Sequence, residues 1–160
     1  MKMSDLFFQD KNQLYSINLN KNAYEKMLKY CTKSNPYETG GILLGNYSAD
    51  QSTANILQAT PPPKNSKHLK CNFCRGTDGL QKVLDSAWIQ GQYYIGEWHY
   101  HPNSLPIPSS TDINQMISLA KDKKLMCPEP ILIIIGERNL NWSVHASIFT
   151  NCGYTILHKK

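Results

Sequence analysis

The sequence predicts a single α/β domain in which helices pack against a mixed β-sheet. Two segments carry apolar residues at the spacing of amphipathic helices, and others alternate as half-buried strands do. The run 131–135 is continuous and β-branched, which is typical of a central strand covered on both faces. A chain of 160 residues suits one core of ordinary size, so we expect one domain over residues 1–160 and no second one.

The first half of the chain should hold three strands and one helix. Asn20 is a typical N-cap residue, and the helix that it begins should end near Ser34, because a following proline disfavours the α region in the residue before it. One face of this helix is apolar and should be buried, with Tyr24, Met27, Leu28 and Cys31. After an N-terminal stretch with little pattern, strands are expected at 14–19, 42–47 and 52–60.

The second half should hold two helices and four strands. A stripe with helical spacing ends at the stop signal Gly91, and its last large residue, Trp88, is expected to anchor the core. The other members of this stripe are Leu80, Val83, Leu84 and Ala87. A further helix is expected from Asp112 to about residue 124. The strands are expected at 92–101, 131–135, 142–148 (with one buried face) and 154–157 (a last edge strand).

Composition indicates a cytoplasmic protein. Five cysteines, an odd number, with no signal-peptide pattern at residues 1–10, indicate reduced thiols. No apolar run is long enough to span a bilayer, so we expect no membrane partner. The net charge of +5 is mild for this length and hints at an acidic partner; we do not expect nucleic acid as a ligand.

Residues 64–75 concentrate basic side chains around a single Cys-X-X-Cys, formed by Cys71 and Cys74. A lone pair of this kind is a weak signal for a metal or redox site, and two unrelated thiols in a loop or edge strand are the simpler interpretation. The lysines and Arg75 either form a solvated face or dock an acidic stretch of a protein partner.

The residues with chemical potential lie near the end of the predicted strand 92–101. His99 and His101 are two apart and would share one face of the strand, and Asp112 follows a loop stiffened by three prolines. Two imidazoles and a carboxylate suit a catalytic zinc, which keeps its fourth position for water, although iron or manganese would also accept these ligands. A structural interpretation is open for each: ordinary strand histidines, and a helix capping box formed by Ser109 and Asp112.

Taken together, these residues resemble a known motif. The spacing His99-X-His101-Pro102, six residues, Ser109, two residues, Asp112 is similar to the JAMM motif of the MPN (JAB) metallopeptidases, with no member missing. Residues 36–45, which read Pro-Tyr-Glu-Thr-Gly-Gly-Ile-Leu-Leu-Gly, resemble the segment that carries the catalytic glutamate of that family. The likeness extends from about residue 24 to residue 149. Within the family, residues 96–102 and 127–130 look most like the small bacterial JAMM proteins of CBASS anti-phage operons.

The resemblance implies an MPN (JAB)-type fold with a curved mixed β-sheet, and one zinc ion per chain held by His99, His101 and Asp112. It also implies that Glu38 is the general base and that Ser109 donates a hydrogen bond to the oxyanion.

The residues alone offer a rival base. Glu97 lies two residues before His99 and faces the same side of the strand. The resemblance favours Glu38 and leaves Glu97 as a residue that supports the ligands or faces the substrate.

By the same resemblance, the chain would be a zinc-dependent isopeptidase. It would cleave the bond between the C-terminal tail of a conjugated cGAS-like nucleotidyltransferase and its target protein, in anti-phage defence. Two alternatives stay open: a JAMM peptidase that processes a ubiquitin-like or sulfur-carrier protein after Gly-Gly, and a non-catalytic MPN binding module, although such modules usually lack a ligand. Tyr100, Asn103 and Leu105 are candidates for lining the leaving-group channel.

Overall fold

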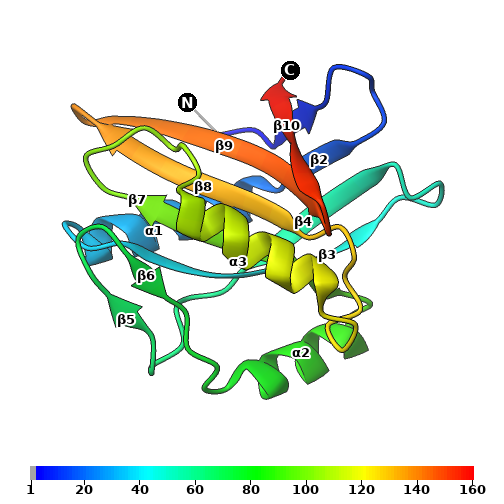
Figure 1. Cartoon of the computed structure of the whole chain (residues 1–160), viewed down its shortest axis with the longest axis horizontal. Coiled ribbons are helices and arrows are strands. Elements are labelled where there is room, and N and C mark those ends of the chain that lie inside the picture. Colours follow the sequence, from blue (N-terminus) through cyan, green and yellow to red (C-terminus); the bar gives the residue numbers. More distant parts are fainter. Residues whose placement is uncertain (1–2) are drawn as a thin grey trace.

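The computed structural model describes residues 3–160, which form three helices, an eight-stranded sheet and a two-stranded hairpin (Figure 1). In chain order the elements are β1 Leu6–Gln9, β2 Ser16–Leu19, α1 Lys21–Ser34, β3 Thr39–Tyr47, β4 Thr53–Ala59, β5 Lys67–His68, β6 Phe73–Cys74, α2 Leu80–Ile89, β7 Tyr93–His101, α3 Ser110–Lys121, β8 Ile131–Arg138, β9 Asn141–Thr150 and β10 Gly153–Lys159.

The large sheet is mixed and closes into a barrel with the strand order β1-β10-β9-β8-β7-β3-β4-β2. Strand β7 runs parallel to β8, and β2 runs parallel to β4, whereas the other neighbours are antiparallel. This arrangement confirms the predicted α/β class and the curved mixed sheet. It also places β7, the strand that carries both histidines, between β3 and β8.

Helix α1 covers the inner side of the curved sheet. Its apolar stripe is buried in one cluster with side chains from the barrel interior, among them Tyr24, Met27 and Cys31 from the helix and Trp98, Tyr100 and Ile133 from β7 and β8. The helix begins where the sequence predicts, since the Asn20 side chain accepts a hydrogen bond of 2.9 Å from the backbone N–H of Asn22. It ends at Ser34, also as predicted.

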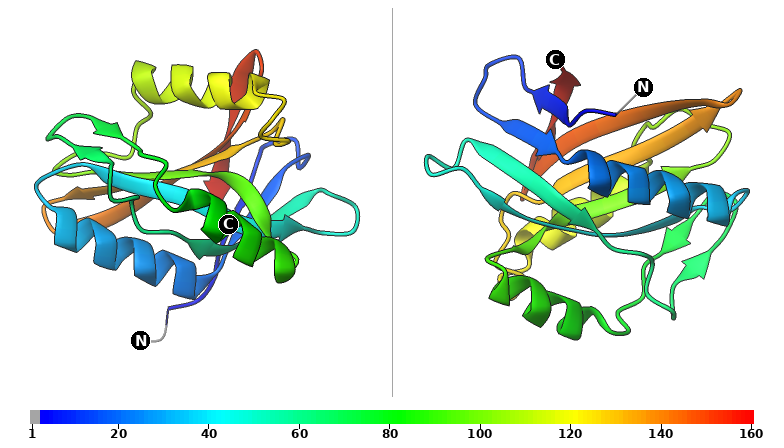
Figure 2. Two further views of the ribbon diagram at one scale, coloured as in Figure 1. Left: turned by 90° about the horizontal axis from the view of Figure 1, so that it is seen from below. Right: turned by 180° about the vertical axis from the view of Figure 1, so that it is seen from behind.

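Helices α2 and α3 cover the outer side of the sheet. Figure 2 shows α1 and α3 on opposite sides of strands β3 and β7. Helix α3 buries Met116 against Leu132, Ile134 and Phe149, while α2 buries Ala87 against Ile42 and Leu44. Because α3 lies on the same side as the outward-facing residues of β7, its first turn can reach the histidines.

The central strand is buried as predicted, since residues 131–135 are each at most 1% exposed. Two other expectations are wrong, and one strand was not predicted. Trp88 is 71% exposed and packs against Tyr93 on the surface, because α2 directs Ala87 and its neighbours toward the sheet instead. Strand β10 is not an edge, because it pairs with β9 and with β1. Strand β1 was not expected, since the N-terminal stretch shows little pattern.

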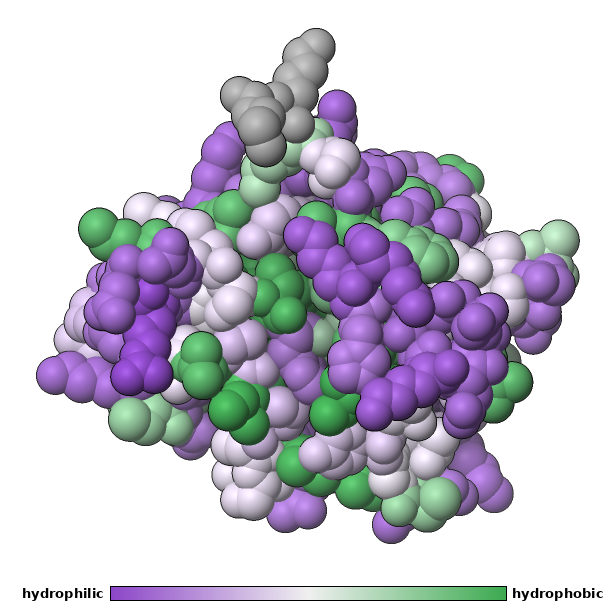
Figure 3. Space-filling model, turned by 90° about the horizontal axis from the view of Figure 1, so that it is seen from above, coloured by the Kyte–Doolittle hydropathy of each residue, from purple (hydrophilic) through white to green (hydrophobic). Residues whose placement is uncertain are grey.

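None of the helices within residues 3–160 combines the length and the apolar character that crossing a bilayer would require. Seen from above, hydrophilic residues dominate the surface and hydrophobic residues form separate small patches (Figure 3).

The buried central strand should dominate stability. Ile133 is fully buried, so Ile133→Ala should lower the free energy of unfolding by about 2–5 kcal/mol through lost burial and the cavity left behind. Urea unfolding measures this value. The matched control is Ile89→Ala, at a residue that is 86% exposed, which should change stability by no more than about 0.5 kcal/mol. Equal losses in the two variants would show that β8 does not form the core.

Candidate metal centre

Strand β7 places His99 and His101 side by side on its outer face. The strand alternates, so Trp98 and Tyr100 point into the barrel while the two histidines point away from it. His99 lies opposite Gly40 of β3, where a Cβ atom would come within 2.2 Å of the Trp98 carbonyl oxygen and 2.8 Å of the Phe73 ring. Glycine at position 40 therefore lets the two strands and the histidine pack closely.

Helix α3 brings Asp112 to the histidines. Ser109 and Asp112 form the capping box that the sequence suggests: the Ser109 hydroxyl accepts from the Asp112 N–H at 3.1 Å, and the Ser109 N–H donates to Asp112 Oδ2 at 2.8 Å. The same carboxylate reaches the sheet, with Oδ1 3.0 Å from His99 Nδ1 and Oδ2 3.3 Å from His101 Nε2. Asp112 therefore belongs both to the N-terminal cap of α3 and to the cluster with the two histidines.

These three side chains fit a metal ion. Within residues 3–160 they are the one group of three or more potential ligands whose ligand atoms all lie within 4.8 Å of one another, and each is at least nine-tenths buried. Ligands about 2.0–2.1 Å from a tetrahedral zinc are about 3.3 Å apart, which matches the 3.3 Å between His101 Nε2 and Asp112 Oδ2. His99 Nε2 is also buried without a hydrogen-bond partner among the described residues, as a nitrogen available to a metal would be.

The charges of the cluster reinforce one another. Burial alone would raise the pKa of the Asp112 carboxyl, but hydrogen bonds from the His101 and His99 imidazoles outweigh it and hold this pKa well below its usual range. Burial opposes the charged form of His101, yet the carboxylates of Asp112 and Glu38 raise the pKa of its imidazole overall. An ionised carboxylate beside two imidazoles is a set of ligands that suits a cation.

Glu38 lies beside this cluster, one residue before β3 and half-buried. Burial raises the pKa of its carboxyl; the nearby His101 opposes this shift and the Asp112 carboxylate adds to it. The pKa of Glu38 is therefore moved from its ordinary value toward neutrality, as a general base requires.

The β5–β6 hairpin packs over Glu38 and His99. The backbone N–H of Glu38 donates to the Leu69 carbonyl oxygen at 2.8 Å, and His68 Nδ1 lies 3.0 Å from the Glu38 carbonyl oxygen. Phe73, which is 5% exposed, meets the His99 ring edge-on with centroids 5.8 Å apart. Sequence patterns gave no signal for these contacts, because a hairpin with two residues in each strand has no readable period.

Glu97, the rival base, has its carboxylate engaged elsewhere. It is fully buried and accepts two hydrogen bonds from Arg75, from Nε at 2.7 Å and from Nη2 at 3.0 Å, and one from the Tyr94 hydroxyl at 2.8 Å. The solvated-face interpretation of Arg75 is therefore wrong, since its side chain is only 14% exposed. A carboxylate held in this way supports the assignment of the base to Glu38.

Other candidates fall outside the cluster. Tyr100 is fully buried inside the barrel and does not line a channel, whereas Asn103 and Leu105 are exposed on the loop after β7. Cys71 and Cys74 are both exposed free thiols.

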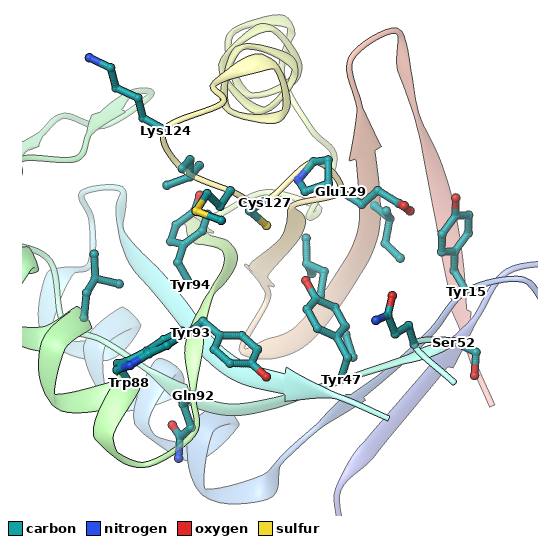
Figure 4. A pocket seen from close by; sticks show the side chains of 18 of the residues that line it. Tyr15, Tyr47, Ser52, Trp88, Gln92, Tyr93, Tyr94, Lys124, Cys127 and Glu129 are labelled. Atoms are coloured by element: carbon teal, nitrogen blue, oxygen red, sulfur yellow. The ribbon is translucent and has the colours of Figure 1, made fainter. Parts of the chain in front are cut away.

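A groove of about 750 Å³ lies away from the cluster, near the start of β7, where Trp88, Tyr93 and Tyr94 line it together with Cys127 (Figure 4). Tyr93 and His101 are eight residue steps apart along the strand, about 26 Å at the usual rise. No cluster residue lines this groove.

Comparison with known proteins identifies the family. A family model described as prokaryotic homologs of the JAB domain matches residues 20–146. A CD-NTase/cGAS isopeptidase of Enterobacter hormaechei is 42% identical over 149 residues, which cover 92% of this chain and 83% of that protein. A probable metalloprotease of Sinorhizobium fredii is 29% identical over 128 residues, which cover 78% of this chain and 77% of that protein.

The fold has a counterpart among solved structures. The solution structure of a protein from Desulfitobacterium hafniense matches with a TM-score of 0.65 and 20% identity, over 90% of this chain and 89% of that chain. At this identity the match shows the fold alone. The family match and the two relatives show more: the chain belongs to the prokaryotic JAB-domain homologues and is a hydrolase of the JAMM (JAB/MPN) type.

Proposed function

We propose that this chain is a cytoplasmic, zinc-dependent isopeptidase of anti-phage defence, which separates the C-terminus of a conjugated cGAS-like nucleotidyltransferase from its target protein. The observation that carries the proposal is the buried cluster of His99, His101 and Asp112 beside a half-buried Glu38. The printed name of the Enterobacter hormaechei relative supports the substrate class.

His99, His101 and Asp112 would hold the ion, with a position left open for water. A bound zinc ion lowers the pKa of its water from about 15.7 to about 7 and polarises the scissile carbonyl. The low pKa of the Asp112 carboxyl keeps that ligand ionised at neutral pH. Because ligand imidazoles must be neutral, protons on His101 compete with the ion.

Glu38 would move the proton. As a carboxylate it takes a proton from the attacking water and then delivers it to the nitrogen of the leaving amine, so the C–N bond breaks without releasing a free amide anion. The burial that raises its pKa makes the first of these transfers easier, because a carboxylate with a higher pKa is a stronger base than an exposed glutamate.

Ser109 would stabilise the oxyanion. Its hydroxyl oxygen accepts from the Asp112 N–H, which leaves the hydroxyl hydrogen free, and the residue is exposed beside the cluster. A donor of this kind contributes about 10²–10³ in kcat in other hydrolases. The capping role and the catalytic role are compatible, since they use different parts of the hydroxyl.

Cleavage of a defined fusion tests the proposal. The tail of a cGAS-like nucleotidyltransferase is joined through its last residue to a reporter protein, and the products are weighed by intact-mass spectrometry with and without a chelator. We expect a cut at the end of the tail that the chelator abolishes. Cleavage only of a matched fusion carrying a ubiquitin-like Gly-Gly terminus would move the enzyme to sulfur-carrier or ubiquitin-like processing. No cleavage of either would favour the binding-only module.

Replacing the proposed base should abolish most activity without unfolding the protein. Glu38→Gln should lower kcat by about 10²–10⁴, because proton transfer is lost while the shape of the side chain is kept. The free energy of unfolding should change by no more than about 0.5 kcal/mol. Glu25→Gln, at an exposed position of α1, is the control and should retain full activity. Full activity of Glu38→Gln would eliminate Glu38 as the base.

The two roles of Ser109 can be separated by substitution. Ser109→Gly removes the hydroxyl at a cap position where glycine costs only a few tenths of a kcal/mol, and it keeps the backbone bond from residue 109 to Asp112 Oδ2. We expect kcat to fall by about 10²–10³ with little change in melting temperature. Ser109→Thr retains a hydroxyl and should keep most of the activity. An unchanged kcat in Ser109→Gly would show that Ser109 acts only as a helix cap.

Removing the Asp112 carboxylate should abolish most of the metal binding. Purified protein dialysed against metal-free buffer should retain one zinc ion per chain, measured by elemental mass spectrometry, whereas Asp112→Asn should lose most of it because an anionic ligand has become neutral. Asp122→Asn, at the exposed end of the same helix, is the control. Equal zinc content in Asp112→Asn and wild type would place the metal elsewhere.

A further inference from the structure

The position of Glu38 depends on a small hairpin. Glu38 lies outside the regular elements, in the turn between α1 and β3, and the partners of its backbone N–H and C=O are in the β5–β6 hairpin: the Leu69 carbonyl oxygen at 2.8 Å and His68 Nδ1 at 3.0 Å. A displacement of the hairpin would therefore carry the proposed base with it.

The hairpin is not stabilised by its own strands. Each strand has two residues, and the pair forms a sheet of its own that does not join the barrel. An isolated two-stranded hairpin is marginally stable at best in water. Apart from the backbone bond between Glu38 and Leu69, its place over the cluster must therefore come from side-chain contacts, and one of these is the edge of Phe73 against His99.

The second contact is a buried ion pair. Arg75 directly follows β6 and presents two guanidinium nitrogens to the two oxygens of Glu97, at 2.7 and 3.0 Å. A third nitrogen, Nη1, donates to the Gly76 carbonyl oxygen at 3.0 Å, and the Gly76 N–H donates to the Ser66 hydroxyl at 2.9 Å, which closes the base of the hairpin. A bidentate, charge-assisted pair of this kind fixes orientation as well as distance.

The other partner of the ion pair, Glu97, belongs to β7, the strand that carries the proposed metal ligands. Glu97 lies on β7 two residues before His99 and is fully buried. Its carboxylate also accepts a hydrogen bond of 2.8 Å from the Tyr94 hydroxyl. One carboxylate therefore links the hairpin, which holds Glu38, to the strand that carries the histidines. Buried ion pairs contribute little net stability compared with apolar replacements, so orientation is the property that such a pair supplies best.

We propose that the Arg75–Glu97 pair, completed by Tyr94, is a positioning device that fixes the β5–β6 hairpin over the metal cluster and thereby sets the place of Glu38. The anchoring of the hairpin follows from contacts alone, whereas its consequence for catalysis rests on the proposed function. A displacement of about 1 Å in a catalytic group can cost roughly 10² in rate, so the loss of the fork should be visible in kcat.

Hydrogen exchange of the full-length protein, followed residue by residue by NMR, tests the anchoring without any substrate. Arg75→Lys keeps the charge but removes the planar fork. We expect the Glu38 and Leu69 amides, which bond within and to the hairpin, to exchange roughly tenfold or more faster, while the Ile133 amide of β8 is unchanged. Glu97→Gln should give the same pattern. Arg138→Lys, at the chain's only other arginine, which is exposed, should change nothing.

Unchanged exchange at Glu38 in both variants would overturn the proposal. So would equal acceleration at every amide, because the pair would then serve global stability only.

A second measurement tests the route to catalysis with the fusion substrate. Arg75→Lys should lower kcat by about 10–10² in the wild-type background, but by less than about threefold when Glu38→Gln is already present, since the group that it positions has gone. Equal losses in both backgrounds would show that the pair does not act through Glu38. If the wild-type protein cleaves no fusion, the proposed function fails, while the exchange experiment still decides whether the pair anchors the hairpin.

Discussion

The Asp112 carboxylate is the group on which the candidate centre depends. It accepts the Ser109 N–H at the start of α3 and lies within 3.3 Å of both imidazoles of β7, so it ties a helix to the sheet at the point where the chemistry would occur. Burial would favour its neutral form, but the two histidines keep it ionised. Without this charge the histidines would lose the hydrogen-bond partner that they share.

The two faces of β7 divide stability from chemistry. Trp98 and Tyr100 point into the barrel and belong to the main core, whereas Glu97, His99 and His101 point to the outer side. The core residues fix the strand, and the strand fixes the proposed ligands. The β5–β6 hairpin then adds a third layer over the cluster, which is held by an ion pair and an aromatic contact instead of by a sheet. The barrel thus carries the proposed ligands, and a separate hairpin carries the backbone partners of Glu38.

Sequence reasoning succeeded where a residue's role is local or periodic. The N-cap at Asn20, the capping box of α3 and the buried run 131–135 each follow from neighbours in the chain, and all three are confirmed. The clustering of the histidines with Asp112 was predicted because a period of two and a short, stiff loop leave few alternatives. Glu38 could be placed near them only through resemblance, since 61 positions separate it from His99.

Polar pairs between residues far apart in the chain could not be predicted from the sequence. Arg75 sits in a stretch of lysines and looks like one more solvated cation, yet its partner lies on β7, and nothing in the local pattern reveals that carboxylate. The prediction for Trp88 was wrong because this residue extends an apolar stripe by one position. The rest of the stripe, including Ala87, packs against the sheet, whereas the indole packs on Tyr93 at the surface. The closure of the barrel by β1 and β10 is likewise a pairing of the two ends of the chain.

Anomalous diffraction at the zinc absorption edge, from crystals of the protein purified without added chelator, tests the central claim most directly. The account predicts one anomalous peak, within bonding distance of His99, His101 and Asp112, with the Glu38 carboxylate facing the open coordination position. A peak at the Cys71 and Cys74 thiols instead, or no peak between the histidines of β7 and the first turn of α3, would contradict it.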